Sequence, residues 1–469
     1  MRAINMHKIS WGLILLLLSL TSRAQEQYRL SADEAVDMAL KKVTEIRNLQ
    51  LDKKLQHAQN REITGQAMPQ LEGSVQLMHY FNIPVTFIPD FISPAVYDVL
   101  VEQGVRDANN QPIQKPTGEP QLFPAAFGVP WQASVGFSLQ QLLFQPDVFV
   151  GLKARGASME LADYNIRVME DSIKSNVLRS YYAVVIAEKR FAILKESVAR
   201  IEKLLSDQNA MYENGFAERL DIDKTQVNLN NLNTSLSQVK NLVELGYAAL
   251  KFATGLEQKD ELVLSDSLNI DMLKEGLLEL PEFQYDDRNE IGLMKTMQKL
   301  QELDVQRYKL SKIPTVSAFW NFSENAQRQK FNFFSANEPW YKTSFIGLNM
   351  SIPIFSGFQK NRRIEQAELN LEKTTNNIVN LQRAIDLQQV SSFTALKNAI
   401  AAVDVQTRNL ELAERVYNTT KIKFEQGLGS SFEILQAQSD FELSQSNYFQ
   451  ALYDAMIARI GYRKALGKL

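Results

Sequence analysis

The residues that could carry catalysis or hold a metal are few and scattered along this chain of 469 residues. His57 and His79 fall on different predicted elements and have no companions at metal-ligand spacing. Asp221 and Asp223 are too sparse for a calcium loop. The chain has no phosphate-binding glycine loop ending in Lys-Ser/Thr, no Gly-x-Ser-x-Gly and no His-Glu-x-x-His. The sequence therefore predicts no enzyme, no metal site and no cofactor.

The first 24 residues are typical of a secretory signal peptide. Arg2 and Lys8 precede the apolar run Trp11–Leu20, and small residues follow at Ser22 and Ala24. The run is too short for a spanning helix, which needs about 20 apolar residues. We therefore expect cleavage before Gln25 and a mature chain that leaves the cytoplasm.

Composition narrows what the mature chain does. Without cysteine it forms no disulfide and carries no cysteine-linked lipid. Its formal charge is −3, and removal of Arg2, Lys8 and Arg23 with the signal peptide makes it −6. That balance is mild for this length and argues against a nucleic-acid partner.

The chain contains an internal repeat. Gly215 and Gly427 lie in similar segments 212 residues apart, and the same offset relates Gly255 to Gly467. Further upstream, Val135–Gln145 matches Ile346–Ser356 at an offset of 211, and Ala67–Ser74 matches Lys312–Phe319 at 245. We therefore expect a single unit over residues 25–469, made of repeat 1 (residues 30–255), a linker (256–286) and repeat 2 (287–467).

The change of offset locates an insertion of 34 residues in the first repeat, between Asn82 and Pro130. Eight of the fourteen prolines of the chain lie there, which predicts a long loop without regular structure.

Each repeat is expected to hold a helix, two strands, a very long helix, a glycine turn and another long helix. Period-two alternation predicts strands over Leu71–Phe81, Gln132–Gln141, Thr315–Phe322 and Ser344–Pro353. No proline interrupts the chain after Pro146 as far as Asn214, or from Ser356 to Gln426. Apolar residues at helical spacing predict an amphipathic helix of about 100 Å in each stretch.

The strands suit either a soluble sheet or an outer-membrane barrel with an apolar side toward lipid. Tryptophans favour the barrel, because interface aromatics belong at strand ends and all three of the mature chain fall in or beside these strands: Trp131, Trp320 and Trp340. Four strands cannot close a barrel, and open edges cannot face lipid. The strands must therefore be completed by other chains; three chains would supply twelve strands, which is even and within the range of bacterial barrels. We expect a mostly α fold with a transmembrane β-barrel.

Four segments, taken in order, resemble the TolC-like outer-membrane efflux proteins. LSADEAVDMAL (Leu30–Leu40) is similar to the family's first helix, and SIPIFSG (Ser351–Gly357) to its strand-to-helix motif. NGFAERLDI (Asn214–Ile222) and QGLGSSFEIL (Gln426–Leu435) are similar to its two periplasmic helix turns. The strand–helix junctions carry Pro69, Pro146, Pro314, Pro353 and Gly357.

The resemblance implies a homotrimer whose twelve strands form a barrel in the Gram-negative outer membrane, continued across the periplasm as an α-helical barrel. Its inner end would dock on a periplasmic adaptor that serves an inner-membrane transporter, and substrates would pass through unchanged. The 82–130 insertion would then lie on the extracellular side, where it could plug or gate the mouth.

Two sets of site residues follow from the resemblance. Adaptors dock on the family's turns, which correspond here to Gly215, Phe216, Ala217, Gly427, Leu428 and Gly429. The glycines are equally explained as helix C-caps. Acidic rings narrow the family's tunnel, and the corresponding positions here are Glu433 and Gln436, with Asp221 six residues after the first turn glycine.

Glu433 also fits a capping box with Ser430 at the start of the last helix, and both interpretations stay open. The basic residue with which the family links its two turns is replaced by Gly429, so the closing contact is missing or rebuilt. Arg219 is one candidate to replace it.

Two other functions remain possible at this stage. A periplasmic coiled-coil scaffold or adaptor would explain the helices but leave the strands and their aromatic residues without a purpose. A periplasmic hydrolase with a helical stalk would need a catalytic cluster that the sequence lacks.

Overall fold

The computed structural model describes residues 27–118, 122–266 and 283–469. They form two compact units, each assembled from separate stretches of the chain. Unit 1 comprises Met1–Gln59, Lys153–Val305 and Glu365–Leu469 as far as these are described, and unit 2 comprises Asn60–Leu152 and Gln306–Ile364. The expected signal peptide and residues 267–282 of the expected linker lie outside the described residues.

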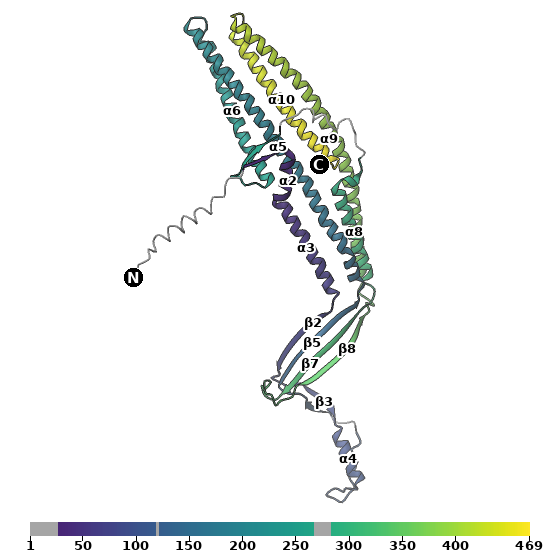
Figure 1. The fold of residues 1–469 in the computed structure, drawn as a ribbon. Coiled ribbons are helices and arrows are strands. Elements are labelled where there is room, and N and C mark those ends of the chain that lie inside the picture. Colours follow the sequence, from purple (N-terminus) through teal and green to yellow (C-terminus); the bar gives the residue numbers. More distant parts are fainter. Residues whose placement is uncertain (1–26, 119–121, 267–282) are drawn as a thin grey trace, which may run out of the picture. The chain divides into compact units, whose positions relative to one another are not determined.

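Unit 2 is built on a four-stranded antiparallel sheet (Figure 1). Its strands follow the order β2 (Gln70–His79), β5 (Trp131–Phe144), β7 (Thr315–Arg328) and β8 (Tyr341–Ser351). All four strands expected from the alternation are confirmed. The register aligns Leu71, Leu139, Trp320 and Ile346 in one row across the sheet, and β2 and β8 are its edges.

This register gives the sheet two different faces, because side chains alternate along each strand. One face is apolar over its middle: Leu71, Val75, Leu77, Val135, Phe137, Leu139, Val316, Ala318, Trp320, Phe322, Ile346, Leu348 and Met350. The other face is mostly small and polar, with Phe319 and Phe345 among Gln70, Ser74, Gln76, Gln132, Ser134, Ser138, Ser317, Asn321, Ser323, Thr343 and Asn349.

The insertion between β2 and β5 is more regular than expected, so the prediction of a structureless loop is wrong. It holds an antiparallel pair, β3 (Val85–Pro89) and β4 (Leu122–Ala126), and the helix α4 (Ile92–Glu102). Three of its prolines lie at positions within these elements that proline tolerates. Pro94 lies in the first turn of α4, and Pro89 and Pro124 lie in a two-stranded sheet whose outer sides are unpaired.

Unit 1 is helical and is dominated by two hairpins (Figure 1). The first hairpin joins α5 (Pro146–Glu213, 68 residues) to α6 (Arg219–Thr254), and the second joins α9 (Gln359–Glu425, 67 residues) to α10 (Ser431–Ala465). The two uninterrupted helices expected from the sequence are thus confirmed. Shorter helices are α2 (Ala32–Lys42), α3 (Thr44–Gln66) and α8 (Asn289–Leu310).

A small parallel sheet completes unit 1 and was not expected from the sequence. Strand β1 (Gln27–Leu30) pairs with β6 (Glu261–Leu264), which lies within the expected linker. Strands of four residues are too short for alternation to identify them. The fully buried Tyr181 of α5 fastens this sheet, since its hydroxyl donates to the carbonyl oxygen of Leu30 at 3.0 Å.

No helix within the described residues combines the length and the apolarity needed to cross a membrane.

Candidate functional site

The two hairpin turns have the same backbone conformation and hydrogen bonds. Gly215 and Gly427 have φ values of 80° and 70°. In each turn the glycine N–H and the next N–H donate back to the preceding helix, from Gly215 to Tyr212 and Phe216 to Met211, and from Gly427 to Phe424 and Leu428 to Lys423. This is the Schellman arrangement, so the C-cap interpretation of both glycines is confirmed.

The residues after the two glycines are exposed. Phe216 has 80% of its surface exposed and Leu428 has 77%, so each tip presents one large apolar side chain. Ala217 follows in the first turn. Gly429 follows in the second turn and is closely packed, because a side chain there would lie 3.2 Å from the backbone nitrogen of Phe424.

The helices that leave the turns begin differently. Helix α10 has the capping box: Ser430 Oγ accepts from Glu433 N, and Ser430 N donates to Glu433 Oε2, both at 3.3 Å. Helix α6 has Glu218 at the equivalent position with no side-chain cap. Asp221, the counterpart of Glu433, has no polar side-chain partner among the described residues.

Two further polar residues near the turns, Gln436 and Arg219, bond within their own helices. Gln436 Nε2 donates to Asp440 Oδ1 at 2.9 Å, which adds a carboxylate that the sequence reasoning did not single out. Arg219 pairs with Asp223 at 3.1 Å. The suggestion that Arg219 links the two turns is therefore wrong, because its partner lies one helical turn away on α6.

A buried polar cluster connects the two hairpins near their tips and was also missed. Gln208 of α5 donates through Nε2 to Ser431 Oγ of α10 at 2.8 Å, and both side chains are buried. Arg200 of α5 lies over the stacked rings of Tyr417 and Phe441, 6.0 and 5.6 Å from their centroids. A cavity of about 660 Å³ lies beside this cluster, lined by residues of both hairpins. Gln438 and Glu442 of α10 extend the cluster, since Gln438 Nε2 donates to Glu442 Oε1. We call Arg200, Gln208, Tyr417, Ser431, Gln438 and Glu442 the tip seam.

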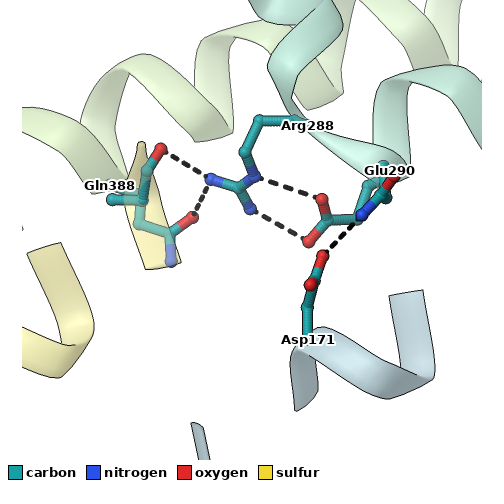
Figure 2. A network of polar contacts seen from close by, with 6 residues as sticks. Asp171, Arg288, Glu290 and Gln388 are labelled. Atoms are coloured by element: carbon teal, nitrogen blue, oxygen red, sulfur yellow. Dashed lines mark hydrogen bonds and ion pairs between the residues drawn. The ribbon is translucent and has the colours of Figure 1, made fainter. Parts of the chain in front are cut away.

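A second buried cluster ties the end of the chain to three helices (Figure 2). The buried Arg288 donates from Nε and Nη2 to the two oxygens of Glu290, at 3.1 and 3.0 Å, and from Nη1 to Gln388 Oε1 and Ala465 O, at 3.2 and 3.0 Å. Asn289 Nδ2 donates to Asp171 Oδ2 at 2.7 Å. We call Asp171, Arg288, Asn289, Glu290 and Gln388 the clamp.

The clamp sets the ionisation of Glu290. Burial alone would raise the pKa of this carboxyl, but the hydrogen bonds from Arg288, with the nearby charges of Arg288 and Lys464, outweigh burial and hold the pKa below its usual value.

The apolar face of the sheet is uncovered within unit 2. Val75, Ile346 and Leu348 are 80%, 81% and 71% exposed. At the end of the sheet where β5 begins, the connection between β7 and β8 lies over this face: Phe333 packs with Ala133 and Ala326, and Phe331 lies 5.1 Å from Trp131. Trp340 joins that cluster, whereas Trp320 lies within β7 and donates to Ser344 Oγ.

The five expected junction residues lie between strands and helices. Pro69 separates α3 from β2, Pro146 is the first residue of α5, and Pro314 precedes β7. Pro353 and Gly357, which has a φ of 56°, lie between β8 and α9. Among the described residues, no group of three or more His, Cys, Asp or Glu side chains could hold a metal.

Comparison with known proteins finds a matching family and similar sequences. Residues 129–256 and 303–468 match the family described as outer membrane efflux protein. The outer membrane protein TolC of Vibrio cholerae serotype O1 is 21% identical over 344 residues, which cover 72% of this chain and 77% of that protein.

Solved structures share the fold. The crystal structure of CusC, described as forming a transmembrane channel, has a TM-score of 0.72 at 14% identity and covers 93% of this chain and 92% of that one. The CmeC outer membrane channel of Campylobacter jejuni has a TM-score of 0.69 at 17% identity, with 93% and 85% covered.

Proposed function

The chain belongs to the outer membrane efflux protein family, and from this premise we propose that three copies close their sheets into one twelve-stranded barrel. Its function is that of an outer-membrane channel in a tripartite export system, with its helices extending into the periplasm of a Gram-negative cell. The family is one of channel proteins and not of enzymes.

The observation that carries the barrel is the uncovered apolar face of the sheet. In water, a face with Val75, Ile346 and Leu348 so exposed would be an aggregation hazard. Facing lipid, it is the outer wall of a barrel, and the polar face lines the lumen. The unpaired edges β2 and β8 must then pair with other chains, because lipid satisfies no backbone group.

The position of the apolar band supports this arrangement. Leu71 and Ile346 lie in the same row of the register. From that row the apolar residues of β2 run toward His79, as far as Leu77, whereas those of β8 run the opposite way, as far as Met350. The band therefore crosses the strands obliquely, as expected when strands tilt by about 35–45° from the barrel axis.

Other features take their roles from this assembly. The exposed Phe216 and Leu428, with the small residues beside them, would dock the periplasmic adaptor, which serves the inner-membrane transporter. Rings of Asp221, Glu433 and Gln436 would narrow the tunnel and favour cations. The 82–130 insertion would lie outside the cell, since it leaves the sheet at the end opposite α3 and α5.

A pair of neighbouring substitutions tests the barrel. Leu348→Arg places a charge on the apolar face, and Asn349→Arg places the same charge on the polar face. At the lipid midplane the first change should cost about 2–4 kcal/mol of insertion free energy, whereas the second faces a water-filled lumen. We expect Leu348→Arg to deplete the trimer extracted from outer membranes by detergent, and Asn349→Arg to leave it unchanged.

Equal yields for the two variants would mean that the face bearing Leu348 meets water. A water-soluble monomer or dimer of the unaltered chain would reject the barrel and return the protein to the class of periplasmic coiled-coil scaffolds.

A further inference from the structure

The helix α4, within the insertion between β2 and β5, is specified at both ends by its own neighbours in sequence. Asp90 Oδ1 accepts from two backbone N–H groups of the first turn, at 3.1 and 2.9 Å, and so satisfies donors that no helical carbonyl can reach. Gly104, which has a φ of 65°, follows the helix and donates its N–H to the carbonyl oxygen of Val101. The helix is therefore encoded locally and not imposed by a packed neighbour.

Yet α4 has no apolar surface to pack on in its own chain. None of its residues is buried against the described part of the chain, and Ile92, Val96 and Val99 are each at least half exposed. Isolated helices shorter than about 12–15 residues are marginal in water, because most helical stability comes from packing an apolar face. With 11 residues, α4 needs a surface that the single chain does not supply.

The spacing of the exposed residues indicates what that surface is. Ile92, Val96 and Val99, which we call the α4 stripe, occupy the d, a and d positions of a heptad. Isoleucine at both positions favours three or four strands over two, and the two valines share its branched Cβ. The α4 stripe therefore suits a core shared by three copies of the helix.

The proposed barrel would bring three such helices to one axis. Twelve strands about 4.8 Å apart and tilted by about 35–45° give a barrel radius of about 11–13 Å. Residues 80–84 join β2 to β3, and a link of this length can span about 17 Å at about 3.4 Å per residue. Each insertion can therefore reach the axis, and threefold symmetry would set the three helices parallel.

Charge argues against a membrane surface as the partner of the α4 stripe. Helices that lie on membranes are rich in Lys and Arg on their polar face, because these side chains are attracted to anionic lipids. α4 contains neither, and its charged residues are Asp98 and Glu102. Asp98 lies off the stripe and accepts from Lys115 of the same insertion, at 2.7 and 2.9 Å. An uncharged stripe on an acidic helix fits another copy better than it fits lipid.

We propose that the α4 helices of three copies pack together around the threefold axis, with the α4 stripe as their shared core, and form a cap over the outer mouth of the channel. The partner of this surface is thus the same helix in the other two copies. The inference rests on the proposed barrel, which supplies the axis, and adds a contact between copies that the sheets do not make.

Single cysteines test the contact, because the chain has no cysteine of its own. Val96→Cys places a thiol in the α4 stripe, and Val101→Cys places one on the opposite side of the helix; the two valines are 50% and 48% exposed in the single chain. After treatment of intact cells with a short bismaleimide, we expect about tenfold more copies joined in pairs for Val96→Cys than for Val101→Cys, whose thiols point away from the axis. Trimer mass before the treatment checks that both variants assemble.

A carboxylate in the α4 stripe tests the cap. Val96→Asp would bring three charges together among apolar side chains, whereas Val101→Asp would leave them in water. Each change is combined with Asn349→Cys, which places a thiol on the polar face of the sheet, and intact cells are treated with a bulky polymer-linked maleimide. We expect this thiol to be labelled about tenfold faster with Val96→Asp than with Val101→Asp.

The outcomes separate this inference from the proposed function. If the unaltered chain forms no membrane-bound trimer, the barrel is wrong and the cap falls with it. If the trimer forms but neither cysteine is cross-linked, the barrel stands and the α4 stripe belongs on the membrane surface. Equal cross-linking at both positions, or equal labelling with both aspartates, would likewise reject the cap and leave the barrel intact.

Discussion

Two buried polar clusters join the helices of unit 1, and they differ in how completely their hydrogen bonds are made. In the clamp, each of the three nitrogens of Arg288 donates, and the charge is matched by Glu290 (Figure 2). In the tip seam, Arg200 Nε, Gln208 Oε1 and Gln438 Oε1 are buried without a partner. Both clusters include residues of α5 and α9, and both contact α10.

The difference shows how contacts between the same helices can be strong at one level along their length and weak at another. A fully bonded buried ion pair fixes its partners strongly, because breaking it exposes an uncompensated charge. A partly bonded polar layer holds its partners only marginally. We therefore expect the clamp to contribute more to the stability of unit 1 than the tip seam does.

The largest effect should come from Arg288→Met. It removes the positive charge and leaves Glu290 without its partner, for an expected loss of about 3 kcal/mol in the free energy of unfolding, which is at the low end for a buried pair. We expect a value at the low end of the range because the Glu290 side chain is 27% exposed and therefore still partly hydrated. Denaturant titration followed by helical circular dichroism measures the loss.

The matched control is Lys295→Met. Its ion pair with Asp286 is exposed on both sides and should contribute at most about 1 kcal/mol. Equal losses for Arg288→Met and Lys295→Met would mean that the clamp is no stronger than a surface ion pair, and the contrast with the tip seam would fail.

A smaller effect is expected at the two carboxylates beside the tip seam. Glu433→Ala removes half of a capping box and should cost about 0.5 kcal/mol of stability, whereas Asp221→Ala should cost less because Asp221 has no side-chain bond in the described structure. If both line the constriction, both changes should lower the cation selectivity and the block by polyvalent cations.

Reversal potentials in planar bilayers and denaturation midpoints distinguish these roles. A loss of stability at Glu433 with unchanged selectivity would make this residue a cap and not part of the constriction. Either result decides whether Glu433 serves only as a helix cap or also lines the constriction.

The smallest expected effect is the dependence of the free energy of unfolding on pH, which should have opposite signs for the clamp and the tip seam. The pKa of Glu290 is lowered on folding, so its contribution is present above the unfolded value of about 4.5 and is lost as the pH falls through the lower folded pKa. The pKa of Glu442 is raised, so its contribution is present below about 4.5 and is lost as the pH rises through the higher folded pKa.

Denaturation midpoints between pH 3 and pH 7 would measure both effects. Glu290→Gln should remove part of the loss of stability at acid pH, and Glu442→Gln should remove part of the loss on the way to neutral pH. A shift of the same sign in both variants would contradict the difference between the clamp and the tip seam.

Much of the fold could be read from local pattern. Alternation located β2, β5, β7 and β8, and the proline-free amphipathic stretches located α5 and α9. Gly215 and Gly427 marked the helix ends because a left-handed residue is needed there, and glycine adopts that conformation at little cost. The extents of the two repeats, and the docking and constriction roles of the tip residues, stay predictions.

The insertion shows where composition misled. Its prolines were expected to prevent regular structure, yet Pro94 lies in the first turn of a helix and Pro124 lies in a strand of a two-stranded sheet. Proline is disfavoured at positions where the backbone N–H must donate a hydrogen bond. Which positions those are depends on the neighbouring strands and helices of the folded chain.

By itself the sequence determined the four long strands, the long helices, their order and the apolar side of each of those strands, because these follow from spacing along one segment. Only the tertiary structure decided which side chains meet across segments: Gln208 with Ser431, 223 residues apart, and Arg288 with Ala465, 177 residues apart. Whether such contacts satisfy every hydrogen-bonding atom of a buried side chain or leave some atoms without a partner depends on the packing of several helices at once. No local pattern carries that information.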